Sequence, residues 1–172
     1  FNVDGKVYRR SYSFCSSPDV DEPISIAVKL VENGEISRFM HHQITVGDIV
    51  EIAAPNGLFV YKEEKKINRT VFLFGAGVGI TPLFSILKTV LIKEVNTKVI
   101  LIYSSRTAED TLFLNEIDKW QFNYPDRLKV IYLFSNSKNL MRARLNGFLI
   151  NQLVKEEMVF DKNDALFYIC GP

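Results

Sequence analysis

The chain has 172 residues, of which 47% are hydrophobic and 24% are charged, and its formal net charge is +1. This composition is typical of a globular protein, and a charge so close to zero argues against nucleic acid or a membrane surface as the main partner. No apolar run has the length of a membrane span, and we expect neither a membrane span nor a signal peptide. The two cysteines, Cys15 and Cys170, are not spaced as a metal or redox motif, so we expect reduced thiols in a cytoplasmic protein.

The first third of the chain alternates short apolar segments with turns. Residues 1–14 predict a hairpin that turns at Asp4-Gly5, and residues 24–31 alternate apolar and polar side chains as a half-buried strand does. A short helix is predicted at 35–43 and a further strand at 49–53. Short strands at such close intervals indicate a small antiparallel sheet or barrel.

After a charged connector at 63–66 the pattern changes. Strands are predicted at 70–74, 98–104, 128–134 and 165–170, and helices at 82–94, 109–122 and 148–156. Strands that alternate with helices form a parallel sheet with right-handed crossovers. We therefore expect two domains, an antiparallel β-domain at residues 1–66 and an α/β domain at residues 67–172.

Residues 71–82, V-F-L-F-G-A-G-V-G-I-T-P, are the most informative stretch of the α/β half. The apolar run predicts a strand buried on both faces, Thr81 is a candidate N-cap, and Pro82 suits the first turn of a helix. Glycines between a strand and a helix let the backbone approach a phosphate, which the N–H groups of the helix N-terminus attract. The stretch thus predicts a nucleotide phosphate site, although three glycines in a buried strand–turn–helix can also be purely structural.

Four motifs occur in one order along the chain: Arg-Ser-Tyr-Ser at 10–13, Gly-Glu-Ile-Ser at 34–37, the stretch ending at Pro82, and Cys-Gly-Pro at 170–172. In this order they resemble the ferredoxin–NADP(+) reductase family, especially its flavodoxin and phenylacetate-oxygenase reductases. The resemblance implies a Greek-key, FAD-binding antiparallel β-barrel, incomplete at its N-terminus, followed by a Rossmann-like NAD(P)-binding parallel sheet that is truncated at its C-terminus.

The resemblance also implies an activity, in which hydride passes from NAD(P)H to FAD and electrons pass on to an iron–sulfur or flavodoxin-type acceptor. Ferredoxin, flavodoxin or an oxygenase component are the partners it suggests. Two distant cysteines cannot hold a [2Fe–2S] cluster, so such a cluster would belong to a domain outside this chain. A non-catalytic nucleotide-binding regulatory subunit is the alternative, whereas the strand at 10–13 argues against a flavin-free dehydrogenase.

The flavin would be held by the first two motifs. Arg10 has a rigid fork of donors suited to a flavin phosphate, and Tyr12, on the same side of the strand, can lay its ring against the isoalloxazine. The resemblance places Ser13 near flavin N5. It implies further flavin contacts from Ser11, Ala27, Val28, Lys29, Gly34, Glu35, Ile36 and Ser37. The alternatives are an ordinary surface strand at 10–13 and a turn with a capping serine at 34–37.

The nicotinamide nucleotide would be held by the α/β half. The resemblance implies contacts from Gly75, Ala76, Gly77, Val78, Gly79, Thr81, Pro82, Ser105, Arg106, Cys170 and Gly171. An arginine after the second parallel strand accommodates the 2′-phosphate of NADPH, so Arg106 favours NADP(H), with NADH as the alternative. Arg142 and Arg144 either assist it or are solvated charges.

Three residues, Ser13, Thr81 and Cys170, would line the cavity where the flavin and nicotinamide rings stack, and the resemblance gives Cys170 a role in orienting the nicotinamide. A buried structural cysteine is the alternative. His41 and His42 have no carboxylate or cysteine spaced to join them, so we interpret them as surface residues and predict no metal site.

Overall fold

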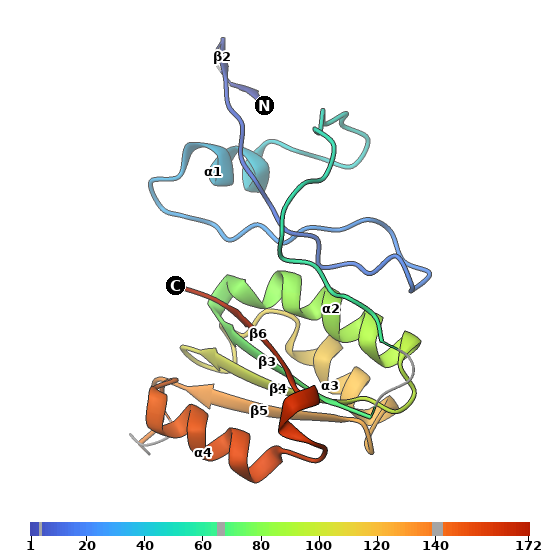
Figure 1. The fold of residues 1–172 in the computed structure, drawn as a ribbon. Helices are drawn as coiled ribbons and strands as arrows, with labels where there is room; N and C mark the ends of the chain where they lie inside the picture. Colours follow the sequence, from blue (N-terminus) through green and yellow to red (C-terminus); the bar gives the residue numbers. More distant parts are fainter. Residues whose placement is uncertain (4, 65–67, 139–142) are drawn as a thin grey trace.

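The computed structural model describes residues 1–3, 5–64, 68–138 and 143–172 (Figure 1). Its centre is a parallel sheet with strand order β5-β4-β3-β6. These strands are β3 (Thr70–Ala76), β4 (Lys98–Ser105), β5 (Leu128–Phe134) and β6 (Leu166–Cys170). The sheet confirms the α/β prediction, and each strand lies within two residues of its predicted bounds.

Helices cover both faces of the sheet, as its uniformly apolar central strands require. On one face α2 (Ile80–Lys93) and α3 (Leu114–Asn123) pack against Leu73 and Leu101 of the central strands. On the other face α4 (Gly147–Glu157) packs against the side chains that point the opposite way along the same strands. Single-turn 3₁₀ helices η1 (Gly77–Gly79) and η3 (Lys162–Asp164) also belong to the described part of this half.

The prediction of a helix from residue 109 was wrong at its start, because α3 begins only at Leu114. Phe113 has a φ of 59°, in the left-handed region, which separates the preceding turn from the helix. That turn is held by the Thr111 hydroxyl, which donates to the Thr107 carbonyl at 2.8 Å. Glu109 therefore lies in a turn and not in the first turn of a helix.

The N-terminal part holds little regular structure. Strands β1 (Asn2–Val3) and β2 (Lys6–Val7) pair antiparallel and confirm the hairpin, whose turn residue Asp4 lies outside the described residues. Helix α1 (Glu35–His42) confirms the short helix. Beyond Val7, the predicted second hairpin strand is reduced to one antiparallel bridge, between Phe14 and Ile26.

The predicted strands at 24–31 and 49–53 were wrong as regular strands, and a barrel is absent from the part of the chain that the structure describes. The physical reason is that strand pairing needs partners, and here apolar side chains stand in water. Ile49 is 99% exposed and Leu58 is 98% exposed. A two-residue hairpin and a single bridge cannot cover such surface.

The connector between the two halves is anchored by a buried ion pair. Arg69 Nη2 lies 2.6 Å from Glu94 Oε1, and these side chains are 5% and 1% exposed. The Tyr61 hydroxyl and the Glu64 amide donate to the same carboxylate oxygen at 2.5 and 2.8 Å. The predicted domain boundary at residue 66, like Lys65, lies outside the described residues and stays a prediction.

Candidate functional site

The glycine stretch forms a tight turn at the carboxyl end of β3. Ala76 ends the strand, η1 follows, and α2 begins at Ile80. Gly77 has a φ of +53°, which suits glycine better than any residue with a side chain. Its carbonyl accepts a hydrogen bond of 3.1 Å from the Tyr103 hydroxyl, and burial raises the pKa of Tyr103 to about 12. Tyr103 thus stays a protonated donor that holds the turn in place.

Thr81 does not cap the helix, so that prediction was wrong. The N-cap is Gly79, and Thr81 lies inside the first turn, where its buried hydroxyl donates to the Val78 carbonyl at 2.8 Å. Pro82 also lies in the first turn, where a missing N–H leaves no intrahelical bond unmade. Gly79 has no capping side chain, and the Ile80 amide already donates to the Gly77 and Val78 carbonyls, so the other backbone N–H groups of this turn are the candidate donors for an anion.

The Cys-Gly-Pro motif packs closely against this turn. Strand pairing places Cys170 beside Gly75, so both strands end at the same edge of the sheet. A Cβ atom at Gly79 would lie 2.2 Å from the Cys170 carbonyl oxygen, and one at Gly171 would lie 2.8 Å from the Ala76 Cβ. The two motifs, almost a hundred residues apart in the sequence, therefore form one surface of closely packed backbone.

The Cys170 thiol is half-buried at this edge, and burial raises its pKa. A thiol with a raised pKa is neutral at pH 7 and is a poor nucleophile. The side chain can therefore pack against a ligand ring beside the glycine turn, but it is not set up for covalent chemistry.

The end of β4 lies next to the glycine turn, because Ser104 pairs with Ala76. Ser105 is buried, and its hydroxyl lies 2.8 Å from both the Thr107 carbonyl and the Thr111 hydroxyl, to one of which it donates. Ser105 thus shapes the loop, whereas Arg106 is exposed on it. Of the other two arginines, Arg144 is exposed and Arg142 lies outside the described residues.

The Arg-Ser-Tyr-Ser motif lies in extended chain before the Phe14 bridge. The Arg10 guanidinium lies over the ring of Tyr8, 5.6 Å from its centroid, and donates to the Arg9 carbonyl at 2.9 Å. Arg10, Ser11 and Ser13 are exposed, and Tyr12 is half-buried. The structure thus leaves the polar groups of this motif accessible to a ligand.

The Gly-Glu-Ile-Ser motif opens α1, with Gly34 as its N-cap. The Ser37 hydroxyl donates to the Gly34 carbonyl at 3.1 Å and accepts from the Val31 amide at 3.2 Å, so it is committed to the turn. A Cβ at Gly34 would lie 2.5 Å from that hydroxyl, which explains the glycine. The backbone amides of Glu35 and Ile36 remain as donors at the helix start.

The extended segment at 27–29 runs beside α1. Val28 offers its carbonyl, which accepts a hydrogen bond of 2.7 Å from His41 Nε2. This contact gives His41 a structural partner. Among the residues that the structure describes, no three His, Cys, Asp or Glu side chains gather as metal ligands.

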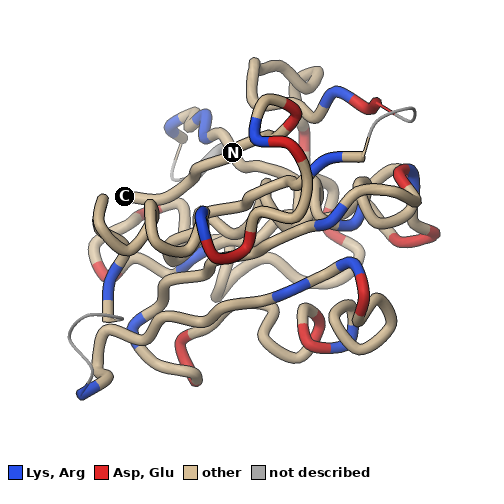
Figure 2. Tube along the Cα trace, turned by 60° about the horizontal axis from the view of Figure 1, so that its bottom comes forward, with Lys and Arg blue, Asp and Glu red and all other residues tan. Residues whose placement is uncertain are grey.

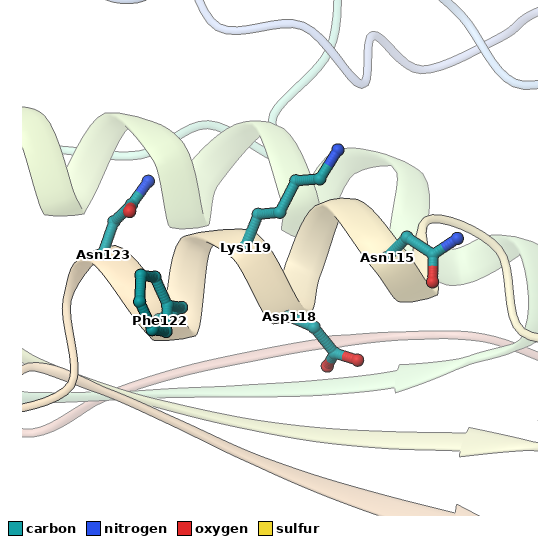
Figure 3. Close-up of a pocket in the computed structure, with 5 residues that line it drawn as sticks. All are labelled: Asn115, Asp118, Lys119, Phe122 and Asn123. Carbon is teal, nitrogen blue, oxygen red and sulfur yellow. The ribbon is translucent and has the colours of Figure 1, made fainter.

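A hollow on the surface of the α/β half lies away from these motifs. All the residues that line it come from α3, as Figure 3 shows: Asn115, Asp118, Lys119, Phe122 and Asn123. Asp118 already accepts a hydrogen bond of 2.8 Å from the Tyr132 hydroxyl. Polar groups from several elements usually converge on a ligand site, and this hollow is lined by one helix face alone. We therefore take the sheet edge at Gly79 and Cys170 as the candidate site.

The fold and the site define a class of protein: a nucleotide-binding α/β domain whose ligand edge is the carboxyl end of a parallel sheet. The family model for the oxidoreductase NAD-binding domain matches residues 73–172, and that for the oxidoreductase FAD-binding domain matches residues 1–61. The chain therefore belongs to the ferredoxin–NADP reductase-like family of FAD- and NAD-binding oxidoreductases.

Among its relatives is a component of the 1,2-phenylacetyl-CoA epoxidase of Escherichia coli, which is 34% identical over 99% of this chain and 48% of its own length. NADH-cytochrome b5 reductase 1 from Lodderomyces elongisporus is 32% identical over 99% of this chain and 56% of its own length. The structure of the CS-b5R domains of human Ncb5or, in its NAD+ form, matches the whole chain with a TM-score of 0.80 at 24% identity and covers 51% of that protein's chain, which supports the fold. The chain spans about half the length of the curated relatives it matches.

Some residues that shape the site have no local signal in the sequence. Tyr103 fits the pattern of a buried strand, and its hydrogen bond to Gly77 depends on the pairing of β3 with β4. Lys88 stands among apolar residues of α2 and is buried, which a lysine in an amphipathic helix does not predict. Its partner is an acid 66 residues earlier in the chain.

Proposed function

We propose that the chain is the catalytic module of an NAD(P)H-dependent flavoprotein reductase. The observation that carries the proposal is the closely packed backbone of Gly79 and Cys170 beside the N-terminus of α2, which has no side-chain cap. It provides a phosphate site and a ring site at one sheet edge. The FAD-binding family model over residues 1–61 supports a flavin site in the same chain.

The nucleotide would be held by the chain as follows. The backbone N–H groups around the start of α2 would bind its pyrophosphate, because a helix N-terminus carries partial positive charge and the Gly79 N-cap places no side chain over it; the Ile80 amide, which donates to the Gly77 and Val78 carbonyls, is not one of these donors. The half-buried side of Cys170 would limit where the nicotinamide ring can lie, and the buried hydroxyl of Thr81 would keep the turn rigid. Orientation is the contribution of the protein, since no acid or base is needed for hydride transfer.

The flavin would be held by the first half of the chain. We propose that residues 1–61 belong to a flavin-binding β-barrel in the whole protein, where exposed apolar residues such as Ile49 and Leu58 would be covered. The accessible groups of Arg10 and Ser13, and the amides at the start of α1, fit a phosphate and a polar ring. Bound FAD would supply a hydride acceptor that can release electrons one at a time.

NADPH is the donor that we propose. Arg106 is exposed on the loop after β4, where a guanidinium can meet a 2′-phosphate. NADH is the alternative, because relatives such as the cytochrome b5 reductases carry NADH in their names.

For the electron acceptor we propose an iron–sulfur or flavodoxin-type protein, or an oxygenase component. A relative from Rhodococcus rhodochrous, the ferredoxin reductase component of 3-ketosteroid-9-alpha-monooxygenase, supports this proposal. Figure 2 shows basic and acidic positions interspersed over the described chain, so its charge does not single out one partner surface. The free thiols of Cys15 and Cys170 fit a cytoplasmic setting, and among the described residues no helix is long and apolar enough to cross a membrane.

Visible absorbance tests the proposal. The purified full-length protein should be yellow, and the flavin band should bleach when NADPH or NADH is added without oxygen. The Arg10→Ala variant should retain less flavin, because a charge-assisted hydrogen bond contributes about 1.5–3 kcal/mol. Arg9→Ala is the matched control, since neighbouring side chains of an extended chain point in opposite directions. A colourless protein that still binds the nucleotide would instead indicate a regulatory subunit.

A further inference from the structure

The loop at residues 15–25 joins the two segments that we assign to the flavin. It leaves the Arg10–Ser13 motif at Cys15 and returns toward residues 27–29. The Cys15 amide donates to the Ser25 carbonyl, and the Ser25 amide donates to the Ser16 hydroxyl, both at 2.9 Å. Because the base of the loop is closed in this way, a shift of the loop would move both segments together.

The first residues of this loop are docked on α2. The Ser85 hydroxyl donates to the Ser16 carbonyl at 2.7 Å, and the Thr89 hydroxyl pairs with that of Ser17 at 2.8 Å. Ser85 and Thr89 are four residues apart, so they lie on one face of the helix. This face looks away from the sheet toward the N-terminal half, which lies beyond α2 in Figure 1.

Between these two contacts lies an ion pair of a buried lysine and a partly exposed glutamate. Lys88 Nζ is 2.5 Å from Glu22 Oε1, and the two side chains are 4% and 28% exposed. The same carboxylate oxygen accepts from the Ser17 amide at 2.7 Å. The Lys88 ammonium also lies 4.5 Å from the ring centroid of Phe84. The Lys88 ammonium is therefore neutralised by Glu22 on the loop and lies against the Phe84 ring on α2.

Such a pair contributes more to geometry than to stability. Desolvation of two charges offsets most of their attraction, so a buried salt bridge is often no more stabilising than an apolar contact. What it does provide is a fixed arrangement, because a buried ammonium must stay near its carboxylate. Here that requirement ties the flavin segments to a helix whose first turn is the phosphate site.

Helix α2 is continuous from that site to the ion pair. Lys88 lies seven residues after Thr81, which is about 10 Å along a helix that rises 1.5 Å per residue. Because the helix is rigid, the distance between the nucleotide site at its start and the loop held at Lys88 is fixed.

We propose that Lys88, through Glu22, is a positioning residue that sets the distance between the flavin and nicotinamide sites for hydride transfer. The proposal rests on the proposed function. Lys88 contacts neither ligand: it acts through the loop at 15–25.

The experiment compares variants of the flavin-loaded full-length protein by stopped-flow reduction with NADPH and NADH. Lys88→Met keeps the length of the side chain without its charge, and Glu22→Gln keeps an acceptor for the Ser17 amide. Each should slow flavin reduction by about 10- to 100-fold, because a shift near 1 Å between reacting groups can cost that much. The nucleotide dissociation constant should stay within about twofold, since the phosphate contacts lie elsewhere.

A second readout does not depend on activity. Amide hydrogen exchange at Ser17 and Ser25 should become faster in both variants, because their partners at Glu22 and Ser16 lose their anchor. The double variant should be no slower in flavin reduction than either single one, since the two residues act as a unit. Lys129→Met, which removes an ion pair of 2.7 Å with Glu157 on α4, is the matched control and should leave both readouts unchanged.

The outcomes separate the two proposals. Faster exchange at Ser17 and Ser25 with an unchanged reduction rate would show that the ion pair is only structural and would overturn the positioning role. If Lys88→Met does not fold, Glu22→Gln decides by the same two measurements. A wild-type protein that neither nucleotide reduces would overturn the proposed function itself, and the positioning role with it.

Discussion

The carbonyl oxygen of Cys170 occupies the space that a side chain at Gly79 would need. A Cβ built on Gly79 would lie 2.2 Å from that oxygen, far inside van der Waals contact. The backbone of Gly79 has φ −62° and ψ −12°, which any residue can adopt. The need for glycine here is therefore steric, and it comes from the last strand of the sheet.

Gly79→Ala should separate the two loops. The methyl group would push the start of α2 away from the Cys-Gly-Pro segment, so nucleotide affinity should fall by about tenfold or more, which is about 1.4 kcal/mol. The free energy of unfolding should fall by about 1–3 kcal/mol, as overpacking typically costs. Calorimetric titration with the nucleotide and thermal unfolding measure the two effects.

Gly147→Ala is the control for that variant, because a Cβ at Gly147 meets nothing within 4 Å at the start of α4. It should leave nucleotide affinity unchanged and leave stability equal or raise it by about 0.4–1 kcal/mol. Equal affinity in both variants would show that the close approach of Gly79 to Cys170 has no part in binding.

Cys170→Ala should act on the hydride step. If the half-buried thiol limits the position of the nicotinamide, its loss should slow flavin reduction while nucleotide affinity stays the same, since we propose that the phosphate contacts come from the glycine turn. Misplacement by about 1 Å can cost on the order of a hundredfold in rate. Stopped-flow at the flavin band measures the rate. A destabilised variant with an unaltered rate would restrict Cys170 to packing.

Arg106→Ala should discriminate between the nucleotides. An exposed guanidinium that meets the 2′-phosphate contributes to NADPH alone, so KM for NADPH should rise by about tenfold or more while KM for NADH changes little, as expected when one charge-assisted hydrogen bond is lost. Arg144→Ala, at another exposed arginine, is the control. An equal change in KM for NADPH and for NADH would show that Arg106 does not select NADPH and would favour NADH as the hydride donor.

Glu94 should make the protein sensitive to acid. Burial opposes ionisation of Glu94, but hydrogen bonds from Arg69, Thr97 and Tyr61 outweigh it and hold the pKa of the carboxyl below its ordinary value of 4.5. A lowered pKa in the folded state stabilises the protein above pH 4.5, and this stability is lost as the pH falls through the folded-state pKa.

Glu94→Gln should remove that dependence. The variant should lose about 3–5 kcal/mol of unfolding free energy at pH 7, because the Arg69 cation stays buried without its counter-charge. Its stability should then fall less steeply than that of the wild type below pH 4.5. Urea unfolding at a series of pH values measures both. Parallel curves for the two proteins would show that Glu94 is not the titrating group.

Local patterns in the sequence predicted the elements of the α/β half well. Continuous apolar runs gave the positions of β3 and β4, because strands buried on both faces have no polar alternation. The start of α3 was missed, because the left-handed Phe113 depends on packing against Phe84, at a centroid distance of 5.0 Å, and bulky residues rarely adopt that conformation.

The same patterns predicted the first half less well. The alternation of apolar and polar side chains at 24–31 leads to a strand only where a neighbouring strand pairs with it. The alternation by itself does not identify that neighbour. The tight turn was predicted from its glycines, and its phosphate role stays a prediction. The place of Thr81 was missed, because η1 begins at Gly77 and α2 at Ile80, before the helix start predicted at residue 82.

The sequence by itself determined the α/β architecture, the place of the glycine turn and the family motifs, because hydrophobic period and glycine spacing act over a few residues. Only the tertiary structure decided that Gly79 meets the Cys170 carbonyl and that Lys88 meets Glu22. Contacts between residues so far apart in the sequence form only when the strands have taken their order in the sheet and the helix has packed on one face of it. No local pattern records that choice, because packing of the whole core makes it.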